Sequence, residues 1–134
     1  MTSKTESGDR WERSPGYVYF IAVGQPPVAV KIGITTQRDL PRRLSTLQCG
    51  NHESLTLLRV IPFEGQERPM LEASRVEAEL HARFAHLQRF RKGWAGSEWF
   101  TSTDELQAFV ATAGVQPAER GLVDSVAKPG PGRP

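Results

Sequence analysis

Two short apolar stretches separated by a turn begin the patterned part of the chain. Aromatic and β-branched residues dominate residues 17–21 (Tyr-Val-Tyr-Phe-Ile) and residues 28–34 (Val-Ala-Val-Lys-Ile-Gly-Ile). Residues 24–27 between them (Gly-Gln-Pro-Pro) have turn chemistry, because glycine tolerates a positive φ and proline cannot continue a strand ladder. The pattern therefore predicts a β-hairpin.

The polar residues inside this hairpin are its most informative feature. Side chains alternate across a strand, so Tyr17 and Tyr19 share one face of the first strand, and Lys31 lies on the face opposite Ile32 in the second. An unpaired ammonium is costly to bury. Lys31 therefore either reaches solvent along its aliphatic stem or has a function.

A helix is predicted to follow over residues 40–48, since three leucines of this segment fall on one stripe. At about 100° per residue, Arg43 lies at the edge of this stripe and Arg42 points away from it. We therefore expect Arg43 to rest against the body of the domain and Arg42 to extend into water.

The remaining pattern adds one strand, a short extended segment and two helices. Residues 55–61 form an apolar strand closed by proline, and residues 70–87 have the period of an amphipathic helix. On this second helix Glu77 and His81 lie one turn apart, beside the apolar stripe. Residues 98–101 are predicted as a short extended segment, and a last helix follows it.

This order, β-β-α-β-α with a C-terminal helix, is typical of an α+β domain in which helices flank a small three-stranded central sheet, expected to be antiparallel. Residues 16–113 are expected to form this single domain. Residues 1–15 and 114–134 are polar and aperiodic or rich in proline and glycine, so we expect disordered tails there.

The composition is that of an ordinary globular chain: of 134 residues, 38% are hydrophobic and 24% are charged. The single cysteine, Cys49, excludes an intrachain disulfide bond. Since the chain has neither an apolar leader nor an apolar run of membrane-spanning length, we expect a cytoplasmic protein without a membrane partner.

The net charge of +2 is weakly basic, so the distribution of the arginines carries more information than their number. They gather around the start of the first helix and again after the second. A phosphate-binding face and a solvated charge run explain such clusters equally well. The candidates for nucleic-acid binding are Arg38, Arg42, Arg89, Arg91 and Lys92.

Six residues carry groups suited to phosphodiester chemistry. Each alone has an ordinary explanation, such as a core tyrosine or an exposed ion pair. Taken together they form a useful set: one carboxylate can hold Mg²⁺ or Mn²⁺ with several waters retained, arginine can neutralise phosphate charge, and tyrosine or lysine can activate water. The six are Tyr17, Tyr19, Lys31, Arg43, Glu77 and His81.

Five motifs follow one another along the chain: VYFI, KIGIT, RRLSTLQ, E-x-x-L-H-x-x-F and GSEWF. In this order they resemble the GIY-YIG nuclease superfamily, most closely its small phage-T5-open-reading-frame branch of bacteria and phages. Residues 17–19 stand where the superfamily has Gly-Ile-Tyr, and residues 31–33 where it has Tyr-Ile-Gly. Residues 96–100 resemble the closing Gly-Glu-Trp-Phe motif with one extra residue. The resemblance spans residues 16 to about 110.

This resemblance implies a divalent metal, Mg²⁺ or Mn²⁺, and a hydrolytic cut in one strand of DNA or RNA. In that picture Tyr19 positions or deprotonates the attacking water, Arg43 braces the phosphate, and Glu77 binds the metal. Lys31 replaces the second tyrosine of the superfamily, and becomes a candidate base if burial lowers its pKa. We predict that Tyr19, Arg43 and Glu77 converge within about 10 Å on one face of the sheet, near Lys31.

Two alternatives stand beside a metal-dependent endonuclease of DNA. No asparagine lies near the end of the domain, where many nucleases of this superfamily have one, and the short tails hold no DNA-reading domain. A non-catalytic nucleic-acid-binding or regulatory module is therefore a second interpretation, and sequence-directed cutting would need a targeting protein partner. A zinc site built from Cys49, His52, His81 and His86 is a third. The sequence does not indicate an oligomeric state.

Overall fold

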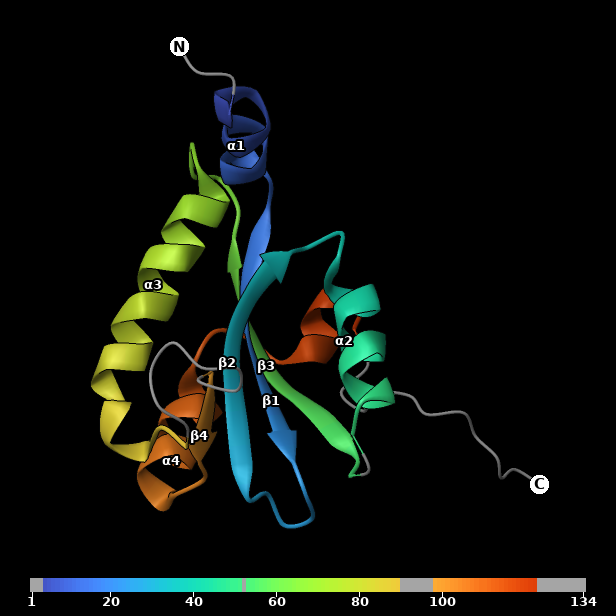
Figure 1. Cartoon of the computed structure of the whole chain (residues 1–134), viewed down its shortest axis with the longest axis vertical. Helices are drawn as coiled ribbons and strands as arrows, with labels where there is room; N and C mark the ends of the chain where they lie inside the picture. Colours follow the sequence, from blue (N-terminus) through green and yellow to red (C-terminus); the bar gives the residue numbers. More distant parts are fainter. Residues whose placement is uncertain (1–3, 52, 90–97, 123–134) are drawn as a thin grey trace, which may run out of the picture.

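The computed structural model describes residues 4–51, 53–89 and 98–122. Its centre is a four-stranded antiparallel sheet in the order β3-β1-β2-β4 (Figure 1). The α+β class is as predicted, but the sheet has four strands rather than three, because the short segment expected at residues 98–101 pairs with the start of β2. The strands are β1 (Gly16–Val23), β2 (Ala29–Thr36), β3 (Leu55–Phe63) and β4 (Trp99–Thr101).

The predicted hairpin is present as β1 and β2. The two strands pair in continuous register from Gly16 opposite Thr36 to Val23 opposite Ala29. Gly24, at the start of the turn, has a φ of 96°, the conformation for which glycine is suited. The turn chemistry read from the sequence therefore fixes both the length and the register of the hairpin.

Helices cover both faces of the sheet. Figure 1 shows α3 and α4 on one face, and α2 with the short η2 turn on the other. The helix predicted to continue to residue 87 ends at Arg83, where Phe84 leaves helical geometry and is fully buried, and a tight turn follows. The helical elements are α1 (Lys4–Arg13), α2 (Leu40–Cys49), α3 (Pro69–Arg83), η1 (Ala85–Leu87), α4 (Asp104–Thr112) and η2 (Pro117–Arg120).

The alternation along β1 divides the core into two layers. Val18 and Phe20 pack on the side of α3 and α4, whereas Tyr17, Tyr19 and Ile21 face α2. The predicted separation of the two faces is therefore confirmed. Because Lys31 pairs directly with Ile21 across the hairpin, it shares the α2-facing side with the two tyrosines.

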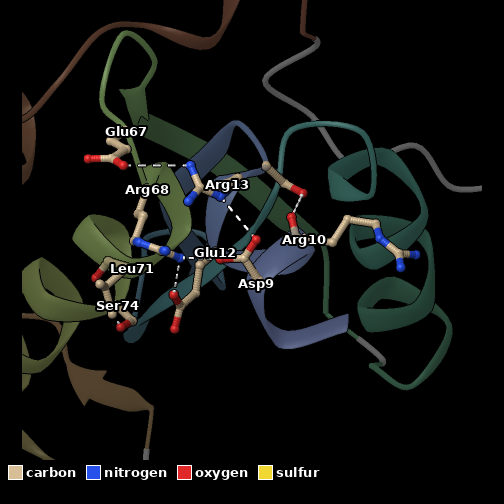
Figure 2. A network of polar contacts seen from close by, with 9 residues as sticks. Asp9, Arg10, Glu12, Arg13, Glu67, Arg68, Leu71 and Ser74 are labelled. Atoms are coloured by element: carbon tan, nitrogen blue, oxygen red, sulfur yellow. Dashed lines mark hydrogen bonds and ion pairs between the residues drawn. The ribbon is translucent and has the colours of Figure 1, made fainter. Parts of the chain in front are cut away.

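The first fifteen residues differ from the expected disordered tail, because Lys4–Arg13 form helix α1. Figure 2 shows the ion pairs that hold it against α3. Arg68 contacts Asp9 and Glu12 at 2.7 Å each, although these carboxylates lie 59 and 56 residues away in sequence. We call this group the α1 network: Asp9, Glu12, Arg13, Glu67 and Arg68.

At the other end, residues expected to be disordered from 114 onward form the η2 turn, while residues 123–134 lie outside the described part. Arg120 anchors this turn by hydrogen bonds to the Tyr17 hydroxyl and to Glu64. Within the described ranges, no helix is both long and apolar enough to cross a membrane.

Candidate functional site

Lys31 lies in the sheet with its ammonium buried rather than in water. The residue is only 9% exposed, and its Nζ atom lies 2.5 Å from Oε1 of Glu98. The indole ring of Trp99, which pairs with Lys31 in the sheet, lies 5.7 Å from the same ammonium. The residue directly before β4 thus supplies the carboxylate that compensates the buried charge.

Helix α3 is fastened to the outer edge of β2. Nε2 of His81 lies 3.0 Å from the carbonyl oxygen of Ile32, to which it donates, and the imidazole packs edge-on against Phe100. The amide of Ile32 donates to the Glu98 carbonyl at 3.0 Å. In an antiparallel strand both backbone groups of one residue point to the same side, so His81 and Glu98 lie along one edge. Glu77, one turn before His81, lies beside that edge.

The carboxylate of Glu77 is held in surroundings that disfavour its charge. Its side chain is 18% exposed, and Oε2 lies 3.8 Å from Nε2 of His81. Burial raises the pKa of Glu77 and the charge of Glu98 adds to this rise, whereas His81 and Lys31 partly offset it. The site therefore contains a carboxylate whose negative charge is only partly balanced by the protein.

The phenol ring of Tyr19 lies over the neighbouring strand β2 at Gly33. A Cβ atom at Gly33 would lie 2.6 Å from the hydroxyl oxygen and 2.7 Å from Cζ of Tyr19. Since such contacts are shorter than carbon atoms tolerate, the phenol can occupy this position only because residue 33 has no side chain. This is the glycine of the KIGIT motif.

Burial also raises the pKa of Tyr19, which Glu98 and Glu77 raise further and Arg43 lowers. The phenol is therefore protonated at neutral pH. A protonated hydroxyl can position a water molecule by hydrogen bonding, while its use as a base would need further positive charge nearby.

The structure brings five residues into one electrostatic group, which we call the edge cluster. The charges of Glu77, Glu98 and Arg43 all act on the phenol of Tyr19, and the charge of Lys31 acts on Glu77. These residues come from both strands of the hairpin, from α2, from α3 and from the residue before β4. The edge cluster consists of Tyr19, Lys31, Arg43, Glu77 and Glu98.

The prediction that Arg43 rests against the body of the domain is wrong. Arg43 is exposed, and it acts on the cluster from the solvent side. Helix α2 buries Leu40 and Leu44, and leaves both Arg42 and Arg43 exposed. The helix contacts the sheet through a narrow stripe only, so a residue at the stripe's edge already meets water.

The remaining candidate residues lie elsewhere or have other contacts. The Tyr17 hydroxyl accepts a hydrogen bond from Nε of Arg120 at 3.1 Å, which fastens the C-terminal turn. The side chains of Arg38 and Arg42 are 92% and 81% exposed, both close to Asp39. Arg89 is exposed as well, while Arg91 and Lys92 lie outside the described residues.

The donor atoms at the cluster fit Mg²⁺ or Mn²⁺ better than zinc. Mg²⁺ uses one or two carboxylates and keeps several waters, and Glu77 offers one such carboxylate, with the charge of Glu98 acting on it. A structural zinc site needs four ligands, and the described residues hold no group of three or more His, Cys, Asp or Glu able to bind a metal. Of the residues considered for zinc, His86 contacts Glu105 and Cys49 is exposed. His52 lies outside the described residues.

Glu98 was not among the residues expected at the site. Its only signal in the sequence is its place in the GSEWF motif, directly before the segment that pairs with Lys31. The contact between Lys31 and Glu98 spans 67 residues, so hydrophobic periodicity alone could not reveal it.

Together the sheet, the flanking helices and the edge cluster define a small α+β domain with a half-buried group of acidic and basic side chains. The family model of the T5orf172 domain matches residues 16–113, so the chain belongs to the T5orf172 domain family. A domain of this phage-open-reading-frame type is what the five motifs suggested, and it is consistent with a nuclease or another nucleic-acid-related role. No curated protein and no solved structure matches the chain.

Proposed function

We propose that the protein is a metal-dependent endonuclease of the GIY-YIG type, which hydrolyses a phosphodiester bond in DNA in the cytoplasm. The observation that carries this proposal is the half-buried, incompletely balanced carboxylate of Glu77 beside Lys31 and Glu98. A binding module gains nothing from a desolvated carboxylate near phosphate, because the two anions repel unless a cation lies between them.

Each residue of the edge cluster has a role in this proposal. Glu77, with Glu98, would hold Mg²⁺ or Mn²⁺, which when bound favours ionisation of water and offsets charge on the phosphate. Arg43, exposed on α2, binds a phosphate oxygen, and the protonated Tyr19 hydroxyl orients the attacking water. Lys31 keeps Glu98 in place and reduces the negative potential of the site.

His81 acts as a positioning residue in this scheme. Its bond to the Ile32 carbonyl fixes α3 against β2, and so fixes the direction from which Glu77 enters the site. We also propose that cutting at a chosen sequence uses a targeting protein partner.

The experiment that tests this function is the nicking of supercoiled plasmid with Mg²⁺ or Mn²⁺. Wild type should nick, and Glu77→Ala should lose at least about 100-fold in rate, since even residues that only support metal ligands cost 10- to 100-fold. Glu79→Ala is the matched control, because Glu79 lies on the same helix and is exposed. Equal nicking by Glu77→Ala and wild type would refute the assignment.

The second candidate function is a binding module that keeps the fold without catalysis. Two observations favour it. Arginines on and before α2 are exposed, and the carboxylate of Glu98 is already ion-paired with Lys31. Salt-sensitive DNA binding by wild type, with no nicking at any concentration of divalent metal, would establish this alternative.

A further inference from the structure

A cleft opens beside α1, and none of its lining residues belongs to the edge cluster. Helix α1 and the connection between β2 and α2 enclose a cavity of about 490 Å³. One wall is formed by α1, which lies outside the matched family range, and the other by residues 36–39. The cleft therefore belongs to this chain and does not follow from the family domain alone.

Both walls of the cleft are fixed to the body of the protein. The α1 network ties one wall to the start of α3 (Figure 2). On the other side, the amide of Gln37 donates to the carbonyl of Pro15 at 2.9 Å, which joins the loop to the segment leaving α1. A ligand would thus meet a largely preformed cleft and would have little ordering cost to overcome.

The side chains in the cleft combine an aromatic surface with cations. Trp11 lines it and is 42% exposed, which is unusual for a side chain of this size. Arg10 also lines it, and Figure 2 shows its side chain extending away from the α1 network toward α2. Arg38 contributes a second guanidinium, 3.7 Å from Asp39, the carboxylate at this end of the cleft.

The cleft leads toward the edge cluster. Asp39 lines it and also lines a neighbouring cavity of about 230 Å³, whose other walls are Arg42, Arg43 and Thr46. A chain of phosphates could therefore pass from Arg43 along the exposed arginines to the aromatic ring. Stacking surfaces beside a cationic track are the features by which proteins bind single-stranded nucleic acid.

We propose that this cleft binds an unpaired nucleotide of a single-stranded nucleic acid, with its base stacked on Trp11 and its phosphates on Arg10 and Arg38. The proposal deepens the proposed nuclease function, in that it rests on nucleic acid being the substrate. It extends the interaction from the cutting site to a flanking, unpaired position of the strand.

Fluorescence anisotropy with a labelled thymidine oligomer of about ten nucleotides tests this proposal. Binding is measured without divalent metal, so that no cleavage occurs. Trp11→Ala should weaken binding by about 5- to 100-fold, the range for loss of one stacked base, and Trp11→Phe should restore most of it. An abasic oligomer of the same length should bind wild type and Trp11→Ala equally.

A control variant, a double arginine variant and two further nucleic-acid probes complete the test. Val28→Ala removes the other large exposed apolar side chain among the described residues, at the far end of the hairpin, and should leave binding unchanged. Arg10→Ala combined with Arg38→Ala should weaken binding of both oligomers and reduce its salt dependence. A duplex should show no Trp11 dependence, and a uridine oligomer tells RNA from DNA as the preferred strand.

Equal affinity of wild type and Trp11→Ala for the thymidine oligomer would overturn the proposal. So would an equal loss on the abasic oligomer, because Trp11 would then act through the fold and not through a base. The nuclease can fail separately: Trp11-dependent binding without nicking would support the cleft and refute the nuclease. Nicking with Trp11-independent binding would do the reverse.

Discussion

The α1 network and the edge cluster contain similar residues but differ in their electrostatics. In the α1 network Arg68 bonds two carboxylates and Arg13 contacts two, and hydrogen bonds from Arg68 and Arg13 hold the pKa of Asp9 below its ordinary value. In the edge cluster burial instead raises the pKa of Glu77 and of Tyr19.

This difference separates structure from function. An acid whose pKa is lowered on folding favours the native state at neutral pH, whereas one whose pKa is raised disfavours it. Among the described residues, the packing of α3 does not require Glu77 to be a carboxylate, since His81 and Lys31 have other contacts of their own. A charge kept under such conditions supports the proposed functional site.

The largest expected effect in the edge cluster, after that of Glu77 itself, is at Tyr19. Tyr19→Phe keeps the buried ring and removes only the hydroxyl above Gly33, so the fold should be retained. If this hydroxyl positions the attacking water, the nicking rate should fall about 100-fold. Single-turnover nicking, with circular dichroism to verify folding, measures this. An unchanged rate would remove Tyr19 from the site.

The loss of nicking rate should be smaller for Arg43 than for Tyr19, and it should distinguish Arg43 from its neighbour Arg42 on α2. Arg43→Ala removes a charge that acts on Tyr19 and should reduce nicking by about 10- to 100-fold, the range of a charge-assisted hydrogen bond. Arg42→Ala is the matched comparison: Arg42 is not among the charges that act on Tyr19, so at saturating protein the variant should change the nicking rate by less than about twofold even where it weakens DNA binding. Equal losses in the two variants would mean that α2 contributes only general positive charge.

In the α1 network, replacing an arginine with alanine should affect structure and not catalysis. Arg68→Ala leaves Asp9 and Glu12 without their shared partner, so α1 should lose amide-exchange protection while kcat for nicking stays within about twofold. Binding of the thymidine oligomer should weaken with it. A large loss of kcat would contradict the separation of the two clusters.

A low pH should likewise reduce the amide-exchange protection of α1. The pKa of Asp9 is lowered from the ordinary 3.8, so its stabilising contribution is present above that value and is lost as the pH falls through the lowered one. Amide exchange measured along a descending pH series, corrected for intrinsic rates, should show α1 opening before the sheet.

Much of the fold could be predicted because its signals are local. The hairpin, the leucine stripe of α2 and the amphipathic stripe of α3 each follow from spacing within one segment. Helix α1 could not, since its sequence is polar, contains Gly8, and depends on Arg68 far along the chain. Its stability comes from tertiary contacts that no local pattern records.

The sequence could place several residues of the edge cluster, but neither Glu98 nor the surroundings of the charges. Motif spacing indicated Tyr19, Lys31 and Glu77, and the hairpin brought the first two onto one face. The ion pair of Lys31 with Glu98, and the solvent exposure of Arg43, depend on how β4 and α2 dock. These are tertiary features, and they decide which charges are balanced.

The most direct test of this account is the thermal midpoint of Glu77→Gln. Because the pKa of Glu77 is raised from 4.5 on folding, its contribution to stability falls as the pH rises from 4.5 through the raised value. Glutamine does not ionise, so the variant should melt above wild type at pH 7.5, match it below about pH 4, and lose nicking. A midpoint below that of wild type at pH 7.5, with nicking retained, would show that Glu77 is an ordinary structural residue.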